Sequence, residues 1–381
     1  MKRKIVLTCT AVAVTSLLAA CGGDDGAATG GDGGDEVQAV FDDYVADAMP
    51  GVDVELVRAA AEEGTVVFYT STNLASNAVA AAFGERFPFI EVEQLQLAGG
   101  TLTERFAAEQ SAGTHAADVL NTSSEPDVLA FAEQGYCEEY TPSSDDRYTD
   151  EDKLPGLVYR WNGTVQGIAY LADTLTDEEI ESLDTWETLV DDRWDGKVFG
   201  WIDAAAGGTT VFVNTYFYDE YGTDLWQEHK DIAGQVNVYG GTNPTTQALL
   251  QGEIDVTGPV GLSAPYEMFA DGAPVQWASP TPTLAVPAGG CIAAEPPHPN
   301  AAKLLWEYVL SDEGQAAMAP YGSVSFLQDF EAPPSDEMAD QPWYQAPDAS
   351  SIVQIPEEDL AATRETVINE WRAIFGEAPP E

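Results

Sequence analysis

The feature that most constrains the fold is a unit that recurs along the chain: an apolar run of strand length, a turn of small hydroxyl or glycine residues, and a helical pattern. The first run covers residues 65–69 and consists of β-branched and aromatic residues. It ends in the turn 70–73, after which apolar residues recur on one helical face from Leu74 to Phe87, until Pro88 stops the helix. This order predicts an α/β protein with parallel strands.

The unit is repeated along most of the chain. Strands are predicted over residues 90–97, 118–120, 165–170, 197–202 and 236–239. Helices are predicted from Thr101, where Glu104 completes a capping box, over 125–134, after 207–210, over 243–252 and from Asn300. Asn243 is predicted to cap its helix, with Pro244 as the first helical residue. No internal repeat of 20–50 residues is present, which excludes solenoids and propellers.

The turns after these strands are candidate ligand contacts. In open α/β sheets, ligands bind outside the carboxyl ends of the strands, where helix N-termini present free N–H groups. Helix capping alone explains each hydroxyl or amide residue, so the prediction depends on the whole set. The candidates are Thr70, Ser71, Thr72, Thr122, Ser123, Gly207, Gly208, Thr209 and Asn243.

The N-terminus predicts export. A basic start at residues 2–4 precedes an apolar run to Ala20, which is typical of a signal peptide over residues 1–20. The sequence LAAC at residues 18–21 resembles the bacterial lipobox, which implies cleavage before Cys21 and a lipid on its sulfur. An ordinary signal with an incidental cysteine is the alternative. Residues 21–50 are expected to be a flexible acidic and glycine-rich tether, and no later stretch is long and apolar enough to span a bilayer.

The charge balance excludes some partners. With 65 acidic and 15 basic residues, the net charge is −50, which repels nucleic acid and anionic lipid headgroups. A protein that seeks cations would fit this charge, but the acids are spread along the whole chain, which favours solubility in salty surroundings. Cys9 lies in the signal and Cys21 is the lipid candidate. Cys137 and Cys291 remain, and an even pair in an exported protein favours a disulfide, although sequence alone does not place the two side by side.

Several segments, taken in order, resemble the bacterial extracellular solute-binding proteins of the iron(III)-binding type. They are EGTVVFYT at 63–70, TWETL at 185–189 with WDGKV at 194–198, QGEID at 251–255, and HPNAAK at 298–303 with LSDEGQ at 310–315. The resemblance implies a type 2 periplasmic-binding-protein fold with two α/β lobes around a ligand cleft. Lobe 1 would hold residues 51–170 and 274–325, and lobe 2 residues 171–273 and 326–381.

The resemblance also implies a function and a pocket. The chain would be the substrate-binding component of an ABC importer, outside the cytoplasm, monomeric and without a cofactor, delivering a small polar solute with an anionic group to a permease. Both Cys137 and Cys291 would fall in lobe 1, which favours their disulfide. Iron-binding relatives carry adjacent tyrosines after the Gly-Glu motif, whereas the matching stretch here, 258–266, has only Tyr266. We therefore expect no metal, with a non-standard Fe(III) site as the alternative, and add Ser263 and Tyr266 to the candidate contacts.

A secreted, lipid-anchored hydrolase is the alternative from another class. The sequence contains no G-x-S-x-G, H-E-x-x-H, C-x-x-C or G-x-x-x-x-G-K-[ST] motif, and its three histidines, His115, His229 and His298, are far apart in the chain. We therefore expect a binding protein rather than an enzyme.

Overall fold

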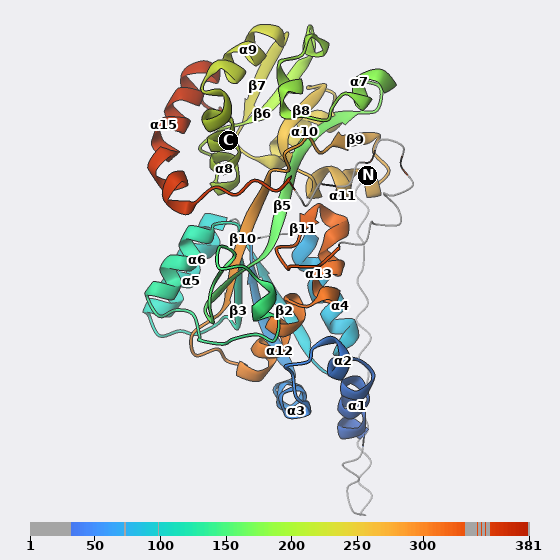
Figure 1. The fold of residues 1–381 in the computed structure, drawn as a ribbon, viewed down its shortest axis with the longest axis vertical. Coiled ribbons are helices and arrows are strands. Elements are labelled where there is room, and N and C mark those ends of the chain that lie inside the picture. The colour runs from blue at the N-terminus through green and yellow to red at the C-terminus, as the bar shows by residue number, and fades with distance from the viewer. Residues whose placement is uncertain are drawn as a thin grey trace, which may run out of the picture.

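The computed structural model describes residues 32–71, 74–97, 99–331, 341, 344, 347 and 351–379, which form two α/β lobes stacked end to end (Figure 1). One mixed sheet runs through both lobes in the order β2-β1-β3-β10-β5-β8-β6-β7, with β4, β9 and β11 paired to β5. The predicted two-lobed α/β fold is confirmed.

Lobe 1 is built on parallel strands that were predicted from the sequence. Strand β1 (Thr65–Thr70) pairs in parallel with β2 (Glu91–Gln96) and β3 (Val119–Thr122). The buried side chains of Val66 and Phe68 belong to the same core as Val79 and Phe83 of α4 (Leu74–Arg86). The other elements of this lobe are α3 (Val54–Glu63), α5 (Gly99–Ser111), α6 (Glu125–Glu133), η2 (Asp145–Arg147), β4 (Lys153–Leu154), α12 (Pro299–Val309), α13 (Asp312–Met318), η5 (Ala319–Tyr321) and β11 (Ser323–Val324).

Lobe 2 repeats the parallel arrangement. Strand β6 (Val198–Ile202) lies between β7 (Gln235–Tyr239) and β8 (Val256–Gly261), parallel to both. Its core is rich in aromatic side chains, with Trp186, Trp194, Trp201, Trp226 and Trp371 all buried. The other elements are α7 (Asp177–Glu181), η3 (Trp186–Val190), η4 (Asp192–Trp194), α8 (Gly208–Tyr221), α9 (Asp224–Ile232), α10 (Thr242–Leu250), α11 (Ser263–Ala270), β9 (Val275–Ala278) and α15 (Glu357–Phe375).

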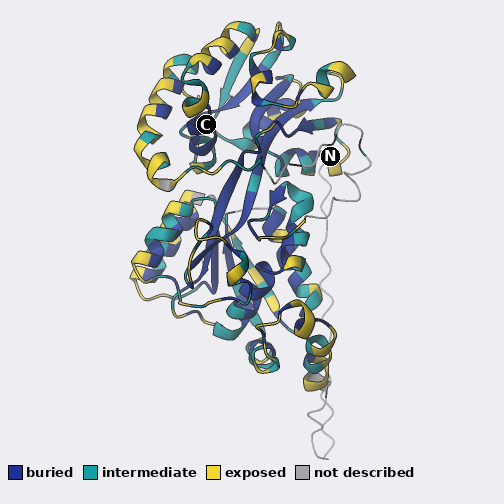
Figure 2. Ribbon diagram, viewed as in Figure 1, coloured by how far each residue is buried: buried dark blue, intermediate teal, exposed yellow. Residues whose placement is uncertain are grey.

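The lobes share the long strand β5 (Val158–Leu171). Its first half pairs with β10 (Ala285–Ile292), β4 and β11 of lobe 1, and its second half pairs with β8 and β9 of lobe 2. The expected boundary at residue 274 is wrong, because β9 belongs to the lobe 2 sheet and the chain returns to lobe 1 through β10. Figure 2 shows that both β5 and β10 are buried where they run between the lobes.

Within the described ranges, the chain crosses between the lobes a third time, near its C-terminus. Phe326 and Leu327 are part of the lobe 1 core, which corrects their predicted place in lobe 2, whereas Val353 packs on lobe 2. Gln354, in the same segment, accepts a hydrogen bond of 2.8 Å from the buried guanidinium of Arg160 in β5. The C-terminal segment is therefore tied to both lobes.

The expected flexible tether over 21–50 is wrong for residues 32–50. These residues form α1 (Asp32–Val40), a π-helical turn η1 (Phe41–Val45) and α2 (Ala46–Ala48). Val37, Tyr44, Val45 and Met49 are buried in the lobe 1 core, which offsets the entropic cost of ordering the segment. The signal peptide and Cys21 lie outside the described residues.

Three predicted helix starts are also shifted. Helix α5 begins at Gly99, so Thr101 lies inside it, and α10 is capped by Gly241, so Asn243 is its second residue. Helix α12 is capped by His298, with Pro299 as its first residue. The amide of Asn300 and the backbone N–H of Ala301 donate instead to the carboxylate of Glu63, at 2.6 and 2.7 Å.

The structure contains the expected disulfide between Cys137 and Cys291, whose Cα atoms are 5.9 Å apart. Cys291 lies in β10 opposite Leu120 of β3, and Cys137 forms a β-bridge with Ala293. The bond therefore joins the chain after α6 to strand β10 in the sheet of lobe 1. None of the helices in the described ranges has the length and apolar character needed to cross a membrane.

Candidate functional site

The lobe 1 side of the cleft is formed where β1 and β3 end. Because these strands are parallel neighbours, their carboxyl ends lie side by side, with Thr70 opposite Asn121. The backbone N–H of Ser123 donates to the hydroxyl of Ser71 at 3.0 Å, which joins the two following loops. Ser71 and Ser123 are partly exposed, so a ligand can reach them.

Two other predicted contacts on this side, Thr70 and Thr122, are buried beneath the loops and cannot touch a ligand. Thr70 is fully buried, and its hydroxyl lies 2.7 Å from that of Ser76 and accepts from the amide of Asn121 at 2.9 Å. Thr122 is also fully buried, and its hydroxyl accepts from the N–H of Ser124 at 3.2 Å. We therefore assign these two side chains a supporting role. Thr72 lies outside the described residues.

The lobe 2 side is formed by the starts of three helices. Helices α8, α10 and α11 follow β6, β7 and β8, whose carboxyl ends lie at one edge of the sheet. The turn before α8 is held by Thr210, whose hydroxyl accepts from the N–H of Gly207 at 3.2 Å. Within the described part of the chain, the N–H groups of Gly208 and Thr209 have no hydrogen-bond acceptor. They can therefore donate to a ligand.

The two sides approach each other closely. A Cβ atom placed on Gly208 would lie 3.7 Å from the carbonyl oxygen of Ser123 in lobe 1. Tyr321 of lobe 1 and Tyr266 of lobe 2 are in edge-to-face contact, with ring centroids 5.1 Å apart. Of the predicted residues, Ser123, Gly208 and Tyr266 therefore lie at the boundary between the lobes.

A pocket of about 650 Å³ opens at this boundary. Leu74 and Tyr321 contribute from lobe 1, and α10 and α11 contribute from lobe 2. The predicted contacts Asn243 and Tyr266 line it, whereas Ser263 starts α11 without lining it. The end where α10 and α11 begin, with the amide of Asn243, is its polar end, and the pocket extends from there along both helices. Ser71, Ser123, Gly208 and Thr209 are not among the residues that line it.

A comparison with protein-family models shows which family the chain belongs to. The model of the family described as bacterial extracellular solute-binding protein matches residues 78–349, most of the chain. The chain belongs to this family. Membership places this solute-binding protein outside the cytoplasm. A search of curated protein sequences gives no match.

Solved structures support the fold of the solute-binding protein. Iron-bound HitA from Pseudomonas aeruginosa is similar with a TM-score of 0.61 and 17% identity, over 81% of this chain and 99% of that chain. The substrate-binding protein of an ABC transporter from Agrobacterium tumefaciens gives 0.63 and 17%, over 82% and 94%. AfuA from Actinobacillus pleuropneumoniae, with fructose-6-phosphate bound, gives 0.58 and 20%, over 82% and 98%. At these identities the likeness concerns the fold alone.

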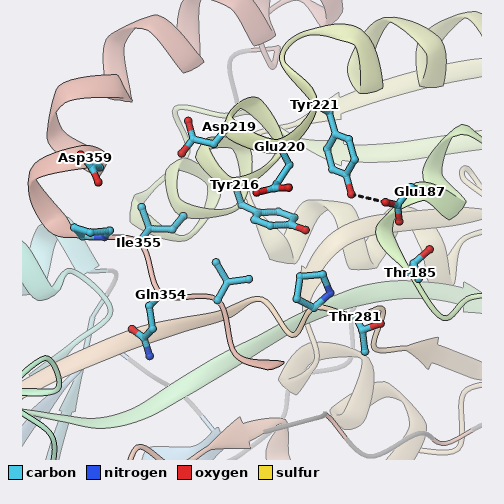
Figure 3. Close-up of a pocket in the computed structure, with 13 residues that line it drawn as sticks. Thr185, Glu187, Tyr216, Asp219, Glu220, Tyr221, Thr281, Gln354, Ile355 and Asp359 are labelled. Carbon is cyan, nitrogen blue, oxygen red and sulfur yellow. Dashed lines mark hydrogen bonds between the residues drawn. The ribbon is translucent and has the colours of Figure 1, made fainter. Parts of the chain in front are cut away.

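A second pocket of the solute-binding protein, of about 680 Å³, lies in lobe 2 between α8, the loop at Thr281 and the C-terminal segment (Figure 3). Four carboxylates line it, those of Glu187, Asp219, Glu220 and Asp359, and no Lys, Arg or His does. Burial and the charges of Asp359 and Glu220 raise the pKa of Asp219. Because none of the residues that line this pocket comes from lobe 1, we do not assign it to the solute.

Some lining residues of the interlobe pocket were not predicted. Gln247 lies one helical turn after Asn243, so the helix period could have found it. Tyr321 is far from the other contacts in sequence, and no local pattern marks it. Among the described residues, no group of three or more His, Cys, Asp or Glu side chains is placed to hold a metal ion.

Proposed function

We propose that this protein is the substrate-binding component of an ABC importer, and that it captures a small polar solute with an anionic group between its lobes and delivers it to a membrane permease. The family match supports solute binding, and the likeness to an ABC transporter's substrate-binding protein supports the importer. We expect the protein to act as a monomer and without enzymatic turnover.

The observation that supports an anionic group is the pair of N–H groups at the start of α8, which have no hydrogen-bond acceptor among the residues that the structure describes. Gly208, which presents one of these groups with Thr209, lies close to Ser123 of lobe 1, and α10 begins at the same sheet edge. Backbone donors and helix dipoles stabilise an anion without any arginine or lysine. The net charge of −50 opposes anion binding, but at physiological salt the Debye length is about 8 Å, so distant acids are largely screened.

A thermal-shift screen of oxyanions, phosphonates, amino acids, polyamines and ferric iron would identify a ligand, because binding to the native state raises the unfolding midpoint. Gly208→Pro then tests the site, since it removes one N–H while Gly207, which is extended, accepts a following proline. Losing one charge-assisted hydrogen bond should weaken anion binding by about tenfold to a hundredfold.

Gly208→Ala is the matched control, because it adds a Cβ atom and keeps the N–H. We expect it to bind within a few-fold of the wild type, as its Cβ would make only an ordinary contact with Ser123. If Gly208→Pro binds the ligand as tightly as Gly208→Ala, the proposed anion site is wrong.

We further propose that residues 1–20 are a signal peptide and that Cys21 carries a lipid that holds the protein on the outer face of the membrane. The lipobox-like sequence at residues 18–21 supports this. Cys21→Ser should prevent processing at this site or release the protein from the membrane fraction. Unchanged processing and membrane retention would contradict lipid anchoring.

A further inference from the structure

The interlobe pocket is much larger than an anionic headgroup requires. Its volume of about 650 Å³ falls in the range of pockets that enclose whole organic ligands. Along α10 the lining runs from Asn243 to Leu250, which are seven residues apart, so the pocket is about 10 Å long at a helical rise of 1.5 Å per residue. An inorganic oxyanion or a bare metal ion would leave most of this space unfilled.

Several side chains in the walls beyond the polar end are apolar. They include Leu74, Met268 and Leu250, together with the ring of Tyr321. Of the large hydrophobic side chains in the described ranges, only Leu154 and Leu250 are exposed, and Leu250 is 41% exposed. The pocket therefore offers apolar surface that protein side chains leave uncovered, and covering it would favour an apolar ligand group.

The far end of the pocket carries negative charge. Glu267 and Asp271 are four residues apart on and just after α11, both are exposed, and no Lys, Arg or His lines the pocket with them. A second anionic group at this end of a ligand would be repelled. The pocket thus differs in charge between its two ends.

We propose that the solute is an organic monoanion with an apolar body, whose anionic group lies at the starts of α8 and α10 and whose body extends along the groove between α10 and α11. Its far end is neutral or positively charged. This inference rests on the proposed function, and it names the class of solute that the same site takes. Because Leu74 and Tyr321 come from lobe 1, lobe closure would complete the wall around the body.

The test compares binding of straight-chain carboxylates and phosphonates of increasing length, from acetate to hexanoate and from methyl- to pentylphosphonate. Each buried methylene should increase affinity about fourfold, so the longest members should bind at least tenfold more tightly than the shortest. Adipate has the six carbons of hexanoate and a second carboxylate, and it should bind at least tenfold more weakly than hexanoate.

Leu250→Ser locates the effect, because the side chain is exposed and its replacement leaves the fold intact. It should reduce the gain in affinity with chain length several-fold. Leu154→Ser is the matched control, since Leu154 is the other exposed leucine and does not line the pocket. It should behave as the wild type.

The outcomes separate the two proposals. If short anions bind and affinity does not rise with chain length, the proposed apolar body of the ligand is wrong. The same holds if affinity rises with chain length equally in Leu250→Ser. In both cases the proposed anion site is not contradicted. If no member of either series binds, both proposals fail. A visible tyrosinate-to-iron band on ferric titration that disappears in Tyr266→Phe would also overturn the inference, because the cargo would then be a metal ion.

Discussion

His229 shows how a single buried group makes stability depend on pH. It is fully buried in lobe 2 between aromatic rings, its Nδ1 bonds to the carbonyl of Leu189, and the ring lies 4.3 Å from that of Phe199. Burial lowers the pKa of His229 from 6.5 to about 4. The folded protein therefore keeps this ring neutral at a pH where the unfolded chain protonates it.

The unfolded state thus binds more protons between pH 6.5 and 4, so this residue lowers stability as the pH falls through that window. The loss should be about 3 kcal/mol at most. His229→Gln keeps a donor for Leu189 but does not titrate, so its urea unfolding free energy should vary less with pH than that of the wild type. Equal pH dependence in both proteins, from pH 7 to 4.5, would show that the ring does not stay neutral.

At the scale of elements, the N-terminal helices are part of lobe 1 rather than a linker to it. Met49→Ala should lower the free energy of unfolding by about 2–5 kcal/mol, because the side chain is 1% exposed in the lobe 1 core. Asp47→Ala is the control from the same segment, since Asp47 is exposed and its loss should change stability by no more than about 0.5 kcal/mol. Denaturant unfolding measures both, and similar small effects would mean that the segment does not pack as described.

The disulfide joins two elements that are far apart in the chain. Reduction of Cys137–Cys291, which are 154 residues apart, should lower stability by about 2–4 kcal/mol. Non-reducing peptide mapping should find the two residues linked, and a Cys137→Ser, Cys291→Ser double variant should reproduce the loss. Free thiols that react with an alkylating agent in the native exported protein would refute the bond.

The sequence predicted those strands whose residue pattern favours the same structure that packing in the fold favours. Strands β1 and β2 were found within a residue at each end, because β1 is an apolar, β-branched run and turn residues follow both strands. Strands β8 and β10 were missed, because glycine and proline in a run normally argue against a strand. In β10 the glycine is required by packing, since a Cβ atom on Gly290 would lie 2.8 Å from Trp306 and 2.9 Å from the carbonyl of Leu120.

The candidate site could likewise be predicted only where local sequence signals mark it. Loops at strand ends could be named, since capping residues and turns are local signals, and Asn243 and Tyr266 do line the interlobe pocket. Which side chains of a loop face the cleft depends on packing beneath it, so the buried positions of Thr70 and Thr122 could not be foreseen. Leu74 and Tyr321 reach the pocket only through the approach of the two lobes.

For the whole molecule, the dominant charge term is repulsion among acidic residues. At a net charge of −50, raising NaCl from 0.05 to 1 M shortens the Debye length to about 3 Å and should raise the thermal unfolding midpoint. The same rise in KCl would show that ionic strength, rather than a specific sodium site, is responsible. An unchanged or lower midpoint would argue that the acids are not a response to salty surroundings.

Strand β5 is shared by the lobes, and β10 comes late in the sequence. Both therefore determine when each lobe can fold as the chain is exported with its N-terminus first. Strand β3 must wait for β10, since Leu120 pairs with Cys291, and lobe 2 must wait for α15 to cover Trp201. Contacts of such long sequence separation form slowly. Neither lobe can therefore be completed until almost the whole polypeptide has been released, so a chain exported in this order has to stay unfolded and protected from aggregation until its last helix arrives.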